Sequence, residues 1–316
     1  MAARKVTASR IFEVISSGRS SFAARDERVS LRVHVDAACP REVSRCVREA
    51  LAAVRLGGVV DVRDMRPPVP GEELPDAVLV LPGDGSGAEL VSSYARAGAS
   101  VGVVVEGALD APRVDLPEQA MALVGVIAAS SPETLSEKLA SWLAGATDKP
   151  IALAACFPFC RRAVTDALVS RCAVENAAVG AVSLVPGSDL PIMCANQAML
   201  ALDIAAAYGR DVSVERALEL AGVVGAGFVW RTVARTLVGL VPGVGGLLKA
   251  GIGYGGTVAT GRALRLRLEL EDGTVEIPRP EPRPAETAPA RASFSAPRPE
   301  PSRADDGYVT VGEAGA

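Results

Sequence analysis

The amino-acid sequence predicts an α/β fold with a mostly parallel sheet, followed by an all-helical, glycine-rich bundle and a disordered proline-rich tail. Over residues 29–148, short apolar runs alternate with helical patterns, as they do in doubly wound sheets. Residues 149–263 form long stretches rich in Ala, Gly, Val and Leu. Residues 278–316 begin with eight prolines in 24 positions, a composition that cannot bury enough apolar surface to fold.

Five strands are predicted after a short amphipathic segment, residues 1–28, which carries Ile11, Phe12 and Ile15. The runs DAVLVL and SVGVVVE are almost continuously apolar, which is typical of strands that are covered by helices on both faces of a sheet. The predicted strands are 29–36, 59–64, 77–82, 101–106 and 122–128.

Helical patterns separate these strands. The clearest one starts after Pro40 and carries apolar residues at spacings of three and four, which form one stripe. The last one is predicted to begin with a capping box of Ser130 and Glu133, with Pro132 inside it.

Composition excludes several classes of function. With 33 basic and 37 acidic side chains the formal net charge is -4, so the chain lacks the overall basic field that favours nucleic-acid binding. The six cysteines form no Cys-x-x-Cys pair, so no metal site is predicted and the thiols are expected to be buried and reduced. The first residues, MAARKVTASR, precede no uninterrupted apolar stretch, so a cytoplasmic location is expected.

The single histidine, His34, lies in the alternating run VSLRVHVD. Alternation places it beside Arg32 on the strand face opposite to Val29, Leu31 and Val33. This position predicts a structural or solvent-facing histidine, and we find no catalytic constellation around it.

The turn after the first strand, DAACPREVSR, contains neither glycine nor lysine, and Pro40 removes a backbone amide. A phosphate-binding loop is therefore excluded there. Later features nonetheless follow the order of a GTPase: Asp110 after the strand VGVVVE, and ALVGVIAASS before the final helix. Residues 29–146 resemble a degenerate GTPase domain that has lost its nucleotide chemistry.

A second glycine motif suggests an alternative. Gly83, Gly85 and Ala88 satisfy the Gly-x-Gly-x-x-Gly/Ala pattern between a strand and a helix, and Glu106 ends the next strand. The glycines would allow a pyrophosphate to approach the backbone, and Glu106 would hold a ribose hydroxyl. An ordinary glycine turn is the competing interpretation.

The helical half contains a predicted helix over 191–208 that ends at Gly209, and a glycine-rich stretch with Gly251-x-x-x-Gly255. Its apolar length is marginal for a bilayer span, so a bundle is favoured over an inserted hairpin within 217–261. Four arginines could meet lipid phosphates or an acidic partner, but a solvated or ion-paired helix face is the favoured interpretation: Arg161, Arg162, Arg231 and Arg235.

Residues 264–277 are predicted to form a β-hairpin, because leucines alternate with charged residues before the Asp272-Gly273 turn. The same string also offers helical pairs, Arg265 with Glu269 and Arg267 with Glu271.

The segments CFPFCRRAVTDALVSRCAVENAAVG, NQAMLALDIAAAYGRDV and RALELAGVVGAGFVWRTVARTLVGLVPGVGGLLKAGIGYGGTVATGRA carry a family resemblance. Over about residues 150–265 the chain resembles the bacterial GTPase-associated domain of unknown function numbered 697. The resemblance implies a helical domain that often follows a GTPase domain and is membrane-associated in some members; it implies no catalytic residues. The residues that carry it are Asn176, Asn196-Gln197, Tyr208-Gly209, Arg231, Arg235, Pro242-Gly243, Thr257 and Gly261.

Together these features predict a non-enzymatic regulatory or scaffolding protein without a cofactor, acting on a protein partner or at the cytoplasmic face of a membrane. A homo-oligomer is left open, and nucleic acid is not expected as a partner. The alternative is an enzyme or sensor that binds a dinucleotide or other nucleotide at the Gly83–Ala88 turn.

Overall fold

The structure is a computed structural model that describes residues 20–69, 71–83, 86–182, 190–210 and 245–273. These residues belong to one compact unit, Met1–Val275. Several predictions lie outside the described residues: those for Ile11, Phe12 and Ile15, for Gly85, for Arg231, Arg235 and Pro242-Gly243, and for the tail 278–316.

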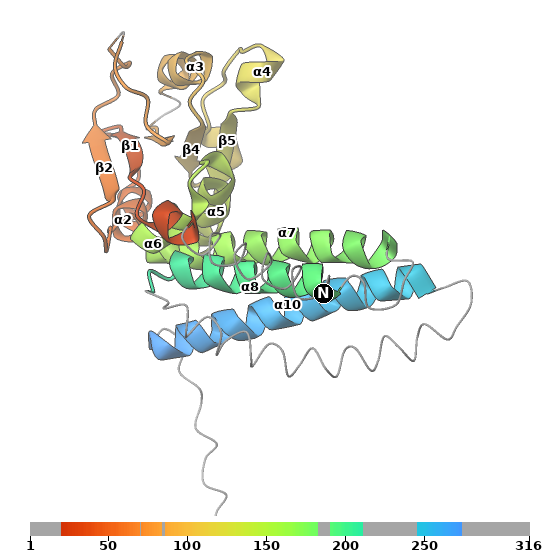
Figure 1. Ribbon diagram of the computed structural model, residues 1–316. Helices are drawn as coiled ribbons and strands as arrows, with labels where there is room; N and C mark the ends of the chain where they lie inside the picture. Colours follow the sequence, from red (N-terminus) through yellow and green to blue (C-terminus); the bar gives the residue numbers. More distant parts are fainter. Residues whose placement is uncertain (1–19, 70, 84–85, 183–189, 211–244, 274–316) are drawn as a thin grey trace, which may run out of the picture. The chain divides into compact units, whose positions relative to one another are not determined.

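The sheet has five strands, all parallel, in the order β2-β1-β3-β4-β5 (Figure 1). The strands are β1 (Val29–Val35), β2 (Gly58–Arg63), β3 (Ala77–Leu81), β4 (Val101–Val105) and β5 (Val124–Ala128). All five predicted strands and the parallel sheet are confirmed. Because the chain passes from the β2 edge to the other side of β1, the strand order changes direction between β1 and β3, which makes this the topological switch point.

Helices cover both faces of the sheet. One apolar core joins alternate strand residues to α2 (Arg41–Ala50) and α5 (Pro132–Ala146). The second apolar core joins the intervening strand residues to α3 (Ala88–Arg96). Ala120 of α4 (Glu118–Met121) also packs against it. The nearly continuous apolar strands are thereby explained, as predicted.

The start of α5 differs from the prediction by one residue. The N-cap is Ser131, whose Oγ accepts the backbone N–H of Thr134 at 3.3 Å, so the predicted box of Ser130 and Glu133 is wrong. Pro132 occupies the first helical position, where its missing N–H has no cost.

The helical half consists of α6 (Pro150–Cys156), the 3-10 turn η2 (Pro158–Cys160), α7 (Arg161–Val182), α8 (Leu190–Ala207) and α10 (Gly245–Glu271). Helices α7, α8 and α10 lie side by side (Figure 1). As predicted, α8 stops at Gly209, whose φ of 72° a glycine adopts without strain. The N–H groups of Gly209 and Arg210 donate to the carbonyls of Ala206 and Ala205, closing the helix end.

The hairpin predicted for 264–277 is wrong in the described part of that segment, because residues 264–271 continue α10. Leu264 and Leu268 share one helix face, where they pack with Val169 of α7, whereas Leu266 is exposed. The helical ion pairs that the string also offered are formed, with Arg267 Nε 3.1 Å from Glu271 Oε1.

The two predicted domains meet at 148/149 without a long connection, since α5 ends at Ala146 and α6 begins at Pro150. Phe157 and Val164 of the helical half belong to the same apolar core as Leu31 and Val33 of β1. The backbone N–H of Val54 also donates to the carbonyl of Cys156 at 2.9 Å. The sheet and the helices of the described chain therefore share one core.

Candidate functional site

The glycine motif lies at the switch point of the sheet. Gly83 follows β3 beside Asp36, which follows β1, and Glu106 follows β4 at the same edge. Ala88 is the first residue of α3. The structure therefore brings Gly83 and Glu106 to the carboxyl edge, where doubly wound sheets bind ligands.

Side chains of the protein already use the hydrogen-bonding groups of this turn. Asp36 accepts the Ala38 amide at 2.8 Å and the Ser86 hydroxyl at 2.5 Å, and Ser86 Oγ accepts the Gly83 amide at 3.2 Å. The Ala38 and Ser86 hydrogen bonds hold the pKa of Asp36 below its usual value. Two amides that could have met a phosphate are thus bonded internally.

Packing explains the glycine at position 83. A Cβ there would lie 2.6 Å from the Cβ of Ala38 and 3.0 Å from Asp36 Oδ1. Gly87, which the motif does not include, requires glycine on two grounds. Its φ of 92° is one that other residues rarely adopt, and a Cβ would lie 2.8 Å from Met65 Cε. In the sequence, the position of Gly87 directly before a helical pattern could have identified it as a helix N-cap.

The carboxyl edge carries negative charge. Burial, together with the charges of Asp36 and Glu106, raises the pKa of the Cys39 thiol. Asp110 accepts the Gly107 amide at 3.0 Å in its own turn. A pyrophosphate at this edge would face carboxylates.

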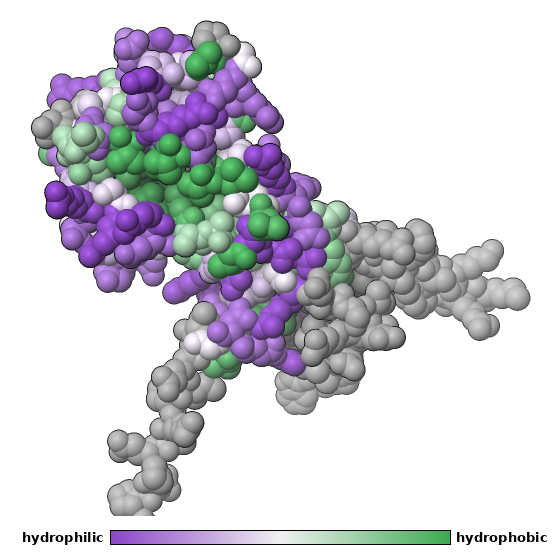
Figure 2. Space-filling model, turned by 90° about the vertical axis from the view of Figure 1, so that its left-hand side faces the viewer, coloured by the Kyte–Doolittle hydropathy of each residue, from purple (hydrophilic) through white to green (hydrophobic). Residues whose placement is uncertain are grey.

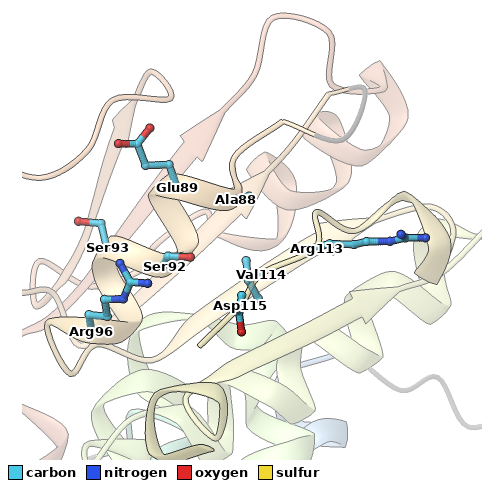
Figure 3. A pocket seen from close by; sticks show the side chains of 8 residues that line it. All are labelled: Ala88, Glu89, Ser92, Ser93, Arg96, Arg113, Val114 and Asp115. Atoms are coloured by element: carbon cyan, nitrogen blue, oxygen red, sulfur yellow. The ribbon is translucent and has the colours of Figure 1, made fainter. Parts of the chain in front are cut away.

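A groove of about 520 Å³ lies beside α3 and includes Ala88, but neither Gly83 nor Glu106. Figure 3 shows Ser92 and Asp115 toward its middle, with Glu89 and Arg113 extending outward in different directions. Its two arginines are balanced by two carboxylates, so it has no evident preference for an anion. The lining residues are Ala88, Glu89, Ser92, Ser93, Arg96, Arg113, Val114 and Asp115.

His34 is structural and only 1% exposed, so the solvent-facing alternative is excluded. Its Nδ1 donates to the Asp64 carbonyl at 2.5 Å, which leaves Nε2 to accept the Tyr94 hydroxyl at 3.0 Å. Arg32 donates to the same hydroxyl at 3.2 Å and pairs with Asp61 and Glu72. Burial lowers the pKa of His34 from its usual 6.5, and the nearby arginines lower it further.

The helical half contains a buried polar layer. Asn176 of α7 donates to the Thr257 hydroxyl of α10 at 2.9 Å and accepts from Asn196 of α8 at 3.0 Å. Asn176 and Thr257 are fully buried. Three of the residues that carried the family resemblance therefore form one network across three helices.

Two glycines allow α10 to approach its neighbours closely. A Cβ at Gly253 would lie 2.9 Å from the Asn176 carbonyl oxygen, and one at Gly261 would overlap the Val169 side chain. With Thr257 between them they form a seam at spacings of four residues. Gly251 and Gly255, which form the Gly-x-x-x-Gly spacing in the sequence, have no atom of the described residues within 4 Å of a Cβ.

Arg161 is ion-paired, which agrees with the interpretation of the four arginines as a solvated or ion-paired helix face. Its Nη1 lies 3.0 Å from Asp272 Oδ2, and its guanidinium covers the Tyr208 ring with its Cζ 5.2 Å from the centroid. Arg210 also pairs with Asp272, at 2.5 Å. Arg162 is exposed.

The cysteines agree with the prediction of buried thiols except at Cys194, which is exposed, and Cys46, which is partly buried. Burial raises the pKa of Cys172 to about 12, so this thiol is held protonated. Within the described ranges, no three His, Cys, Asp or Glu side chains are grouped so that they could hold a metal ion.

No protein-family model, curated protein or solved structure matches this chain. Among the helices that the structure describes, none is both long and apolar enough to cross a bilayer.

Proposed function

We propose that this chain is a non-enzymatic regulatory or scaffolding protein, which acts when its helical bundle contacts a protein partner or the cytoplasmic face of a membrane. One observation carries the proposal: Asp36 and Ser86 bond the Ala38 and Gly83 amides at the switch point. A ligand phosphate would have to displace these bonds and approach the carboxylate of Asp36. We propose also that the α/β part is a degenerate GTPase-like domain, because the turn after its first strand contains neither glycine nor lysine.

The second candidate is a nucleotide-binding enzyme or sensor, and the location of the Gly83 turn at the switch point favours it. Thermal unfolding with NAD, NADP, ATP and GTP distinguishes the two. A ligand at 100 times its Kd adds about 2.7 kcal/mol of stability, so binding would raise the unfolding temperature clearly.

We expect no shift with any of the four nucleotides. A shift that is abolished by Gly85→Asp but retained in Gly145→Asp would establish the nucleotide function instead. Gly145 is a suitable control because it is exposed on α5 and a Cβ there has nothing within 4 Å.

The contact face that we propose lies at one level of the bundle. Gly253 of α10 lies against Asn176 of α7 and Met193 of α8, so the exposed side chains Tyr254, Val174 and Ile192 stand at a similar height, one on each of the three helices. A contact with a lipid surface or a protein partner needs exposed apolar side chains, and this level of the bundle supplies one on each helix.

Vesicle flotation tests this face, with one vesicle type containing anionic lipid and the other only neutral lipid. We expect binding that Tyr254→Glu abolishes and that Leu109→Glu, which changes a fully exposed leucine outside the bundle, leaves intact. If neither vesicle binds, cross-linking in native extract with the same two variants tests the protein partner. Equal behaviour of both variants in both assays contradicts the assignment of this face.

A further inference from the structure

Strand β2 is an open edge of the sheet, because it pairs only with β1 among the described residues. Val29 donates to the Gly57 carbonyl at 2.9 Å, and the parallel register then directs the backbone groups of Val59, Asp61 and Arg63 toward β1. The N–H and C=O groups of Val60 and Val62 consequently face outward. They are available to another strand.

The side chains around this edge are apolar and exposed. Val62 is 66% exposed, and Val54 and Leu56 before the strand and Val69 after it are more than half exposed. Figure 2 views the molecule from the β2 side and shows a hydrophobic area there. The strand contains neither lysine nor proline, two devices that protect natural sheet edges from pairing.

We infer that β2 pairs with β2 of a second copy of this chain, antiparallel about a two-fold axis at Val62, so that two sheets become one continuous sheet. A two-fold axis at a strand edge makes the paired strands antiparallel and brings the same surface of both copies together. The Val62 N–H of each copy then donates to the Val62 carbonyl oxygen of the other copy.

Charge selects this register. With the axis at Val62, Asp61 of each copy lies opposite Arg63 of the other, and both side chains are partly exposed. An axis at Asp61 would place two carboxylates opposite each other, and an axis at Val60 would place Asp61 against the methyl groups of Val59. Opposite charges stabilise a cross-strand pair and like charges destabilise it.

The other edge strand lacks this complementarity. β5 has the sequence VGVIA, so no charged pair can set a register, although its Val126 is 53% exposed. Val126 is therefore the matched control for Val62.

Sedimentation equilibrium of the full chain tests the inference. We expect a mass of twice 32.4 kDa for the wild type and for Val126→Lys. In Val62→Lys, two ammonium groups meet at the axis, and we expect dimerisation at least about ten-fold weaker by charge repulsion across the pair. A monomeric wild type, or a dimer unaffected by Val62→Lys, overturns the inference.

Disulfide cross-linking tests the same β2–β2 pairing independently, in case Val62→Lys folds poorly. Directly opposed residues in an antiparallel pair have Cα atoms about 4.5–5.5 Å apart, within disulfide range. On mild oxidation, Val62→Cys should form a covalent dimer, whereas Val126→Cys should not exceed the wild-type level set by exposed Cys194. Equal cross-linking of both variants assigns any dimer to another surface.

Discussion

At the scale of single residues, the buried polar side chains Arg32 and His34 of β1 are held by hydrogen bonds that oppose protonation of the imidazole. His34 has one nitrogen on the Asp64 carbonyl and the other on Tyr94, while Arg32 and Arg63 lie nearby. Protonation would turn Nε2 from an acceptor into a donor that faces the Tyr94 hydroxyl. The network is thus built for the neutral imidazole.

The pKa of His34 in the folded chain should therefore lie below 6.5. Because the unfolded chain then binds the proton more tightly, the stability due to His34 is complete above pH 6.5 and is lost as the pH falls through the folded pKa. Since the chain has one histidine, an NMR titration of its imidazole gives the value directly. A midpoint at or above 6.5 would contradict the network.

Tyr94→Phe should lower the free energy of unfolding by about 1–3 kcal/mol, because it leaves the buried His34 Nε2 without a donor. Urea unfolding measures the change. Tyr254→Phe, at a tyrosine that is 43% exposed, is the control and should change stability little. Equal effects of the two variants would show that the Tyr94 hydroxyl has no structural role.

At the scale of elements, the α10 seam separates glycines that are required from glycines that are not. Gly261→Ala should destabilise the chain by about 1–3 kcal/mol, because the new methyl group overlaps Val169. Gly255→Ala should stabilise it by up to about 1 kcal/mol, because alanine favours the helix and its Cβ would meet no atom of the described residues within 4 Å. Thermal unfolding of both variants checks the sign, and the same sign for both would be inconsistent with the seam.

The end of α10 shows why local pattern alone was insufficient. Residues 264–270 alternate as a strand would, yet their leucines at spacing four also suit a helix, and only contact with Val169 and its neighbours decides between them. The hairpin prediction failed because a neighbouring helix, distant in sequence, supplies the apolar partner. The Gly251-x-x-x-Gly255 spacing likewise does not identify the contact glycines, Gly253 and Gly261, since spacing does not say which helix face is covered.

At the scale of the whole molecule, the core shared by β1 and α7 implies that sheet and bundle unfold together. Phe157→Ala should lower the free energy of unfolding by about 3–5 kcal/mol, because Phe157 is fully buried where the two parts meet. Hydrogen exchange should then accelerate alike in β1 and α7 amides. Faster exchange in only one of them would show that the parts unfold independently.

The sequence by itself determined the five strands, the covering of both sheet faces and the end of α8 at Gly209. These follow from periodicity, apolar runs and local capping, which act within a few residues. Only the tertiary structure decided the strand order, the internal bonding of the Gly83 turn by Asp36, the Asn176–Thr257 contact and the shared core. Each of these joins residues that are far apart in sequence, and such pairings depend on which surfaces pack together.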